Sequence, residues 1–315
     1  MTSNTVLVTG AGGFIGSALA RRLAATPPGR LILCDRTLGN APAGAERIEG
    51  DLGEPEVLDR ALAAQPDVVF HLASVPSARS EAEPLVSRAV NLDASLALLE
   101  RLATRQRPVR MVYASSIAAL GVSFDGAVDD TVLPSPALTY GAHKLMVETA
   151  LTDATRRGRI HGIALRLPGI VARPPSAAGF GSAFWSEVFH AVGAGQAYDC
   201  PAGPDAVGWL MSLGCCVDNF LHAAALDEPR LKGAVTLPAL SVRLGDLVQA
   251  IARQTGGSAL AVRYAPDPQI MRNFGSYPPL STSAADALGL RHDGDLGALV
   301  ARALADLDVP QGAPA

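Results

Sequence analysis

Short apolar, β-branched runs alternate with longer stretches rich in Ala, Leu and Arg along the first half of the chain. The apolar runs are typical of buried strands and fall at 5–9, 31–35, 68–72, 109–116 and 162–168. The stretches between them predict helices near 14–25, 85–106 and 140–157. Strands and helices that alternate in this way form a parallel sheet with helices on both faces. The first half therefore predicts one doubly wound α/β unit.

The pattern changes after Pro168. Residues 173–181 read R-P-P-S-A-A-G-F-G, a loop composition, and several aromatic residues follow. A helix is expected over 215–227, and the run A-V-T-L-P predicts a strand that returns to the sheet. Two or three small helices and a short strand are expected over 243–315. We therefore predict a larger domain of residues 1–168 with a returning segment near 210–240, and a smaller C-terminal α/β lobe of 169–209 and 241–315.

Composition narrows the class of protein. The chain has 315 residues, 49% of them hydrophobic, which is enough for a full core. Its net charge of −4, without a basic cluster, argues against nucleic acid. No leader pattern and no apolar run of about 18 residues is visible, so we expect no membrane contact and a cytoplasmic protein. The cysteines and histidines lack ligand spacing, which predicts reduced core thiols and no metal. The cysteines are Cys34, Cys200, Cys215 and Cys216.

A glycine-rich loop, G-A-G-G-F-I-G, follows the first predicted strand and opens the first predicted helix. Its Gly10, Gly13 and Gly16 permit a tight turn and let the backbone approach a pyrophosphate, which then lies at the positive end of the helix. The strand before the loop and the helix after it supply the context that this motif needs. The loop therefore predicts a dinucleotide site, with a simple glycine turn as the structural alternative.

Asp35 ends the second predicted strand, 19 residues after Gly16. A carboxylate at this place binds the ribose hydroxyls of the adenosine and repels a 2′-phosphate. Arg36 is the residue that would favour such a phosphate, but beside Asp35 we interpret it as a solvated or paired surface residue. We therefore predict NAD rather than NADP.

Tyr140 and Lys144 lie four residues apart in T-Y-G-A-H-K, at the start of a predicted helix. Residues at this spacing share one helix face, so both side chains reach the same space. Oxidising an alcohol requires a base for the hydroxyl proton, and a free tyrosine with a pKa of about 10 is too weakly ionised. A nearby ammonium and a positive nicotinamide both lower that pKa. We predict Tyr140 as the acid/base and Lys144 as its tuning residue; an ordinary solvated helix face is the alternative.

Five motifs in this order resemble the extended short-chain dehydrogenase/reductase family, also called the NAD-dependent epimerase/dehydratase family. They are G-A-G-G-F-I-G, G-D-L at 50–52, F-H-L-A-S at 70–74, A-S-S-I-A-A-L-G at 114–121 and Y-G-A-H-K at 140–144. The resemblance covers roughly residues 5–240. It implies a Rossmann domain with a C-terminal substrate lobe, NAD as cofactor, and a homodimer formed through the helices near 85–106 and 140–157.

The resemblance also implies roles for individual residues. Ser116 becomes the catalytic hydroxyl that orients the substrate oxygen, with Tyr140 as acid/base and Lys144 also binding the nicotinamide ribose. Serines that only satisfy backbone groups at a strand end are the alternative for Ser115 and Ser116. Beyond the glycines, Asp35, Tyr140 and Lys144, the implied cofactor contacts are Phe14, Ile15, Asp51, Leu52, Leu72, Ala73, Ser74, Asn91, Pro168 and Ile170. The implied substrate contacts are Ser74, Ser77, Ser115, Ser116, Tyr140 and Arg173. A solvated loop serine is the alternative for Ser77, and a structural arginine before two prolines is the alternative for Arg173.

Within that family, the stretches at 72–83 and 165–174 resemble the D-erythronate dehydrogenase group. This implies oxidation of a secondary hydroxyl on a small sugar acid or a related hydroxy compound, as part of carbohydrate metabolism. One departure is that 205–214 has no basic residue to hold a carboxylate. Another is His190, at a position where the group tends to carry an Arg. Phe184, Trp185, Phe189, Trp209 and Met211 cluster in the same part of the chain, and we interpret them as lobe core, with a pocket wall as the alternative.

Two other functions fit parts of the sequence. A nucleotide-sugar epimerase or dehydratase with bound NAD shares the first-half motifs, but a nucleotide clamp would need more basic and Asn residues than 170–210 offers. An NAD-binding sensor without catalysis would have little reason to keep an intact acid/base set. The sequence therefore favours a dehydrogenase with a small-molecule substrate.

Overall fold

A seven-stranded sheet forms the centre of the larger part of the protein. The computed structural model describes residues 4–175, 181–227 and 233–307. The strand order is β10-β6-β5-β4-β1-β2-β3, and every neighbouring pair is parallel. The strands are β1 (Thr5–Thr9), β2 (Arg30–Asp35), β3 (Glu46–Glu49), β4 (Val68–His71), β5 (Val109–Ser116), β6 (Ile160–Leu167) and β10 (Gly233–Thr236). This order confirms the predicted doubly wound Rossmann sheet.

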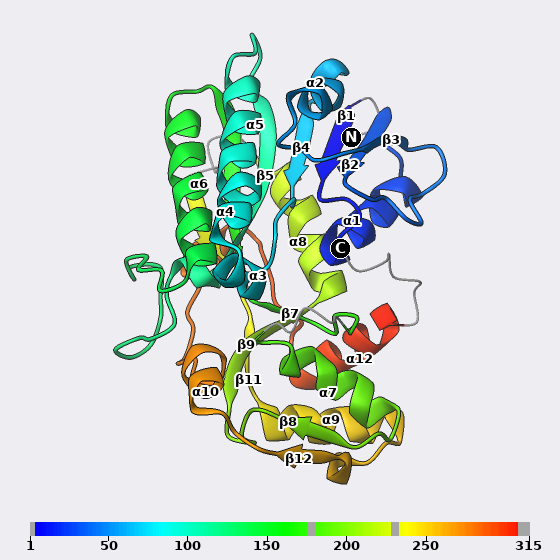
Figure 1. Cartoon of the computed structure of the whole chain (residues 1–315), viewed down its shortest axis with the longest axis vertical. Helices are drawn as coiled ribbons and strands as arrows, with labels where there is room; N and C mark the ends of the chain where they lie inside the picture. The colour runs from blue at the N-terminus through cyan, green and yellow to red at the C-terminus, as the bar shows by residue number, and fades with distance from the viewer. Residues whose placement is uncertain (1–3, 176–180, 228–232, 308–315) are drawn as a thin grey trace.

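Helices cover both faces of this sheet (Figure 1). One face carries α1 (Phe14–Ala25) and α8 (Leu213–Ala225). The other carries α2 (Pro55–Ala63), α5 (Ala94–Ala103) and α6 (Thr139–Arg156). Before α5 the chain forms α3 (Ser77–Ala82), α4 (Pro84–Ser87) and a π-helical turn, η1 (Arg88–Asp93), and a short 3₁₀ turn, η2 (Ile117–Ala119), follows β5. Two cores result, one on each side of the sheet.

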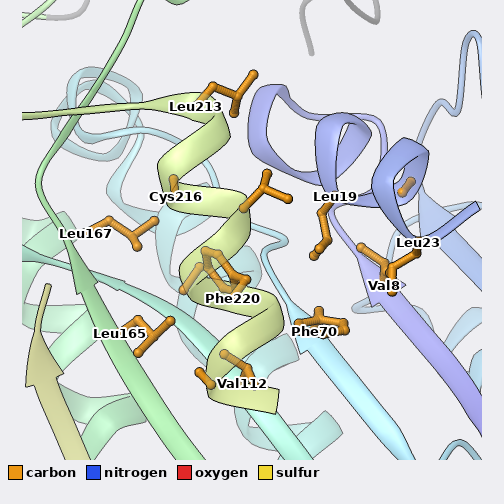
Figure 2. Packing of buried hydrophobic residues seen from close by; sticks show 14 of the residues in the cluster. Val8, Leu19, Leu23, Phe70, Val112, Leu165, Leu167, Leu213, Cys216 and Phe220 are labelled. Atoms are coloured by element: carbon orange, nitrogen blue, oxygen red, sulfur yellow. The ribbon is translucent and has the colours of Figure 1, made fainter. Parts of the chain in front are cut away.

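Figure 2 shows the core between the sheet and α8. Phe220 of α8 meets Phe70 of β4 edge to face, with 6.4 Å between the ring centroids. Leu19 of α1 is fully buried in the same cluster. An aromatic pair of this kind contributes about 0.5–1.5 kcal/mol beyond its buried area. The packing fixes α8 and α1 on one face, so that the loop before α1 opens at the carboxyl edge of the sheet.

The remaining residues form a smaller α/β lobe below the sheet (Figure 1). It contains a three-stranded sheet, β11-β9-β7, and a two-stranded sheet, β12-β8. The strands are β7 (Gly169–Val171), β8 (Tyr198–Cys200), β9 (Val207–Ser212), β11 (Leu240–Arg243) and β12 (Val262–Tyr264). The helices are α7 (Phe184–Gly193), α9 (Leu244–Thr255), the 3₁₀ turn η4 (Ala259–Ala261), α10 (Pro268–Phe274) and α12 (Leu296–Leu307). A separate core of α7, α9 and α12 side chains supports the lobe. The short helix α11 (Ser283–Ala287) instead packs against β10 of the large sheet.

The predicted elements of the first half agree closely with the structure. Two elements, β3 and α2, were not predicted. The four residues E-R-I-E of β3 give too little alternation to mark an edge strand. Strand β10 pairs with β6, so the run A-V-T-L-P does return to the sheet. The four cysteines are free and buried. Among the described residues, no helix combines the length and the apolar character that a membrane span requires.

Candidate active site

One cavity of about 400 Å³ lies at the carboxyl edge of the large sheet and continues to the lobe. Open α/β sheets bind ligands at this edge, where the strand order reverses, here between β1 and β4. The glycine loop and the segments after β4, β5 and β6 line one side of the cavity. Residues of α7, β9, α10 and the segment after α10 line the other. The cavity therefore brings the predicted cofactor site and the lobe together.

Close backbone contacts shape the glycine loop. Gly10 has a φ of +71°, and a Cβ there would lie 2.5 Å from the backbone nitrogen of Ala73. A Cβ on Gly16 would collide with the carbonyl oxygen of Gly10. Gly13 precedes α1 and lines the cavity, where any side chain would intrude. The loop is thus a bare backbone cradle at the positive end of α1, which fits a pyrophosphate.

Asp35 lies beside this loop at the end of β2. Its Oδ2 accepts a hydrogen bond from the N–H of Gly12 at 2.9 Å, and its Oδ1 accepts one from the N–H of Arg36 at 2.7 Å. The Arg36 side chain is exposed. A carboxylate at this position fits the predicted contact with the adenosine ribose and the preference for NAD.

Tyr140 and Ser116 meet where α6 begins and β5 ends. Helix α6 begins at Thr139, with Leu138 as its N-cap residue. The N–H of Thr139 donates to Oε1 of Glu81 at 2.6 Å. Ser116 precedes the turn η2, and its Oγ accepts the N–H of Ala118 at 3.1 Å. Both side chains line the cavity. The predicted hydroxyl pair is therefore formed by two elements far apart in sequence.

Burial raises the pKa of Tyr140 above 10, whereas the hydroxyls of Ser74 and Ser116 and the Arg173 guanidinium lower it in part. The net direction is opposite to the lowering expected from a neighbouring lysine. A phenol in a dry cavity resists ionisation unless positive charge lies close to it. Of the described side chains, Arg173 supplies such charge from the lobe side of the cavity.

Lys144 is buried one turn below Tyr140. Its Nζ donates to the carbonyl oxygen of Ala114 at 2.7 Å and lies 4.9 Å from the ring centroid of Tyr113 and 5.4 Å from that of Tyr140. Burial lowers the pKa of Lys144 to about 7, although the charge of Glu148 opposes this change. The ammonium is thus fixed between two aromatic rings and directed at the cavity.

Sequence reasoning missed a buried ion pair behind this lysine. Oε2 of Glu148 accepts a hydrogen bond from Nη2 of Arg166 at 2.8 Å, and Oε1 accepts one from Nε at 3.0 Å. The Ser115 hydroxyl also donates to Glu148. Side-chain exposure is only 3% for Glu148 and 13% for Arg166. The i, i+4, i+8 spacing of Tyr140, Lys144 and Glu148 on α6 was the signal that could have revealed Glu148.

The predicted cluster of four aromatic residues and Met211 divides between core positions and the wall of the cavity. All five residues are buried, and Phe184 and Phe189 lie in the lobe core as interpreted, whereas Met211 belongs to the core of the large sheet beside α8. Trp185 and Trp209, however, also line the cavity, so for them the pocket-wall alternative holds. Phe274 and Tyr277, which sequence reasoning did not single out, complete the wall. No local pattern marks these two residues, because the tertiary fold alone brings them to the site.

Most predicted site residues line the cavity. These are Gly10, Gly13, Phe14, Ile15, Gly16, Leu72, Ser74, Ser77, Ser115, Ser116, Tyr140, Lys144, Pro168, Ile170 and Arg173. Asp35, Asp51, Leu52, Ala73 and Asn91 do not line it. Asn91 is fully buried and holds the loop after β4, since its Oδ1 accepts the N–H of Val75 at 2.8 Å and its Nδ2 donates to the Val75 carbonyl. Direct cofactor contacts of these five stay predictions.

Comparison with protein families supports the motif assignment. Residues 6–204 match the NAD dependent epimerase/dehydratase family. Two relatives, both D-erythronate dehydrogenases, align along nearly their whole length. The protein of Cupriavidus necator is 34% identical over 308 residues, covering 91% of this chain and 94% of the relative. That of Haemophilus influenzae is 30% identical over 298 residues, covering 91% and 95%.

Comparison with solved structures supports the fold. The crystal structure of a nucleoside-diphosphate-sugar epimerase from Agrobacterium tumefaciens superimposes with a TM-score of 0.87 at 27% sequence identity. The superposition covers 95% of this chain and 93% of that one. The sheet and the lobe are therefore both shared with this structure.

Proposed function

Because the chain belongs to the NAD dependent epimerase/dehydratase family, we propose that it is an NAD-dependent oxidoreductase that converts a secondary hydroxyl of a small hydroxy acid to a ketone. The observation that carries this proposal is the convergence of Ser116, Tyr140 and Lys144 in a cavity that also includes the glycine loop. The two relatives named above act on D-erythronate, a small sugar acid of this class.

Ser116, Tyr140, Lys144 and Arg173 have separate roles in the proposed oxidation. NAD, when bound, accepts a hydride from the carbinol carbon. Ser116 binds the substrate oxygen and holds it against Tyr140, which takes the hydroxyl proton at Oη. Lys144 and Arg173 supply the positive charge that favours the phenolate, and Lys144 would also hold the ribose of the nicotinamide when NAD is bound. The lobe residues that line the cavity shield Tyr140 and Lys144 from water.

Arg173 is the residue that we assign to the substrate carboxylate. It lies just after β7, lines the cavity, and its charge acts on Tyr140. Its Nη2 donates to the hydroxyl of Ser182 at 3.3 Å, which orients the guanidinium. A guanidinium binds a carboxylate through two parallel hydrogen bonds. Ser74, Ser77 and Ser115, which line the same cavity, are the further substrate contacts that we propose. Residues 169–209 and 241–315 act as the substrate lobe.

We also propose that the protein acts as a cytoplasmic homodimer. Its four thiols are free and buried, which suits a reducing compartment. Leu85 of α4 and Met146 of α6 are exposed by 80% and 51%, on the helices that pair in many members of the family. An exposed apolar side chain of this size favours a protein contact when several lie on one helical layer.

The test is a matched pair of tyrosine variants. Tyr140→Phe removes only the hydroxyl, so NADH formation from a hydroxy acid should fall by roughly 10²- to 10⁴-fold. NAD binding, measured by calorimetry, should be unchanged. Tyr264→Phe makes the same substitution on β12 of the lobe, away from the cavity, and should keep full activity. Full turnover by Tyr140→Phe would contradict the proposal.

The same assay separates a dehydrogenase from an epimerase. A dehydrogenase releases NADH in proportion to substrate, whereas an epimerase returns the hydride and accumulates none. Formation of NADH from a hydroxy acid would also exclude a pure NAD sensor. Conversion of a nucleotide sugar without net NADH would favour the epimerase.

A further inference from the structure

Four aromatic side chains of the lobe line the same cavity as Tyr140. We define this aromatic wall as Trp185, Trp209, Phe274 and Tyr277. Backbone hydrogen bonds hold the last two beside β9. The N–H of Val207 donates to the carbonyl of Gly275 at 2.8 Å, and the N–H of Tyr277 donates to the carbonyl of Val207 at 3.1 Å. The wall is therefore built into the lobe.

Both indole N–H groups of the wall are already bonded inside the protein. Nε1 of Trp185 donates to the carbonyl of Phe274 at 3.0 Å, and Nε1 of Trp209 donates to that of Pro278 at 2.7 Å. Tyr277 packs on Trp209 with 4.8 Å between ring centroids. The two tryptophans are therefore without a free donor, and they are only 3% and 1% exposed, so Phe274 and Tyr277 supply most of the apolar surface of the wall.

Polar groups on this side of the cavity are mostly engaged. The Ser74 and Ser116 hydroxyls act on Tyr140, and the Ser182 hydroxyl accepts from Arg173. Among the described cavity residues, the hydroxyls of Ser77, Ser182 and Tyr277 remain able to donate to other substrate groups. Each buried substrate hydroxyl without a partner lowers kcat/KM by about tenfold. An apolar group against such a wall instead gains roughly 10- to 200-fold per methylene.

We propose that the substrate is a hydroxy acid whose carbinol carbon carries an apolar substituent, and that this substituent packs on the aromatic wall. The inference rests on the proposed function, in which Arg173 takes the carboxylate and Tyr140 the proton. During oxidation the C–H bond breaks, its electron pair leaves with the hydrogen for NAD, and the hydroxyl proton passes to Tyr140. The products are a 2- or 3-oxo acid and NADH, so nothing else is consumed.

A series of hydroxy acids tests this substrate class. The purified protein with NAD is given D-erythronate, 2-hydroxybutanoate, 3-hydroxybutanoate and 2-hydroxy-3-phenylpropanoate, each of the last three in both enantiomers. We expect at least one apolar acid to exceed D-erythronate in kcat/KM by about tenfold or more. A higher value for D-erythronate would overturn the inference and leave the proposed function intact. Failure of every acid to reduce NAD would overturn both.

A variant of the aromatic wall tests the same inference in a second, independent way. Phe274→Asn places an amide in the wall and keeps the backbone carbonyl that binds Trp185. We expect the ratio of kcat/KM for the best apolar acid to kcat/KM for D-erythronate to fall about tenfold or more. Leu260→Asn, at a position 94% exposed on η4, is the matched control and should change neither. An equal loss for both substrates in Phe274→Asn would show that the wall does not select. If that variant does not fold, the wild-type series alone decides.

Discussion

Among the residues of the candidate site, Lys144 is the one whose burial costs the most folding stability. It is 1% exposed, and burial lowers its pKa from 10.5 to about 7. Each unit of pKa difference between folded and unfolded states corresponds to about 1.4 kcal/mol. The Ala114 carbonyl and the rings of Tyr113 and Tyr140 compensate the ammonium only in part. A charge that serves the chemistry is thus held at the expense of the fold.

Lys144→Met should stabilise the protein without cofactor and remove most of its activity. Below pH 7 the lysine is charged in both states, so the cost of burying the cation is complete. As the pH rises above 7, the folded lysine loses its proton before the unfolded one, and the cost shrinks. The gain in melting temperature should therefore be largest near pH 6–7 and decrease toward pH 9. Kcat/KM should fall by at least about a hundredfold.

Thermal unfolding of wild type and Lys144→Met between pH 6 and 9 checks this prediction. Only the difference between the two proteins is compared, since other groups titrate equally in both. A variant that is less stable than wild type at pH 7 would mean that the Ala114 bond and the ring contacts outweigh the desolvation of the cation.

Among the helices and strands, α6 connects Tyr140 and Lys144 to the large sheet. Its first turns carry Tyr140 and Lys144, and the next turn carries Glu148, which binds Arg166 of β6 and Ser115 of β5. Ser115 and Arg166 are register partners in the sheet. The buried pair therefore fixes the helix against two strands, one turn beyond Lys144.

Glu148→Gln should lower the free energy of unfolding by about 3–5 kcal/mol, because it leaves the Arg166 guanidinium buried and uncompensated. The variant Glu148→Gln/Arg166→Met should recover part of this loss. Chemical denaturation measures both. Asp153→Asn, which breaks exposed pairs on the same helix, is the control and should be indistinguishable from wild type. An equal loss in the single and double variants would contradict the ion-pair account.

The sequence predicted α6 and its reactive pair but not Glu148 with Arg166. Tyr140 and Lys144 belong to one short motif, whereas the ion pair joins a helix to a strand 18 residues away. Periodicity places a glutamate on a face, but only the packed sheet shows that this face is buried. The second half of α6 was predictable because Val147, Leu151 and Ala154 recur at helical spacing.

At the scale of the whole molecule, local order and tertiary assembly account for different parts of the site. The cofactor side was predictable, since the glycine loop, Asp35 and the strand ends follow one another along a repeating βα pattern. The substrate side was not, because Trp185, Trp209, Phe274 and Tyr277 come from segments up to 92 residues apart, 277 minus 185. Trp185 and Trp209 were assigned to the core, and core and wall have the same sequence signature.

Assembly of two copies is the remaining prediction at this scale. We expect sedimentation to show a homodimer, and Met146→Glu to raise its dissociation constant by about a hundredfold or more. Met146 is 51% exposed on α6, and a twofold interface through this helix would contain the substitution twice, with two carboxylates lying in an apolar contact. Leu260→Glu changes an even more exposed leucine on the lobe and should leave the dimer intact. A dimer that tolerates Met146→Glu but is weakened by Leu260→Glu would move the interface from α6 to the lobe.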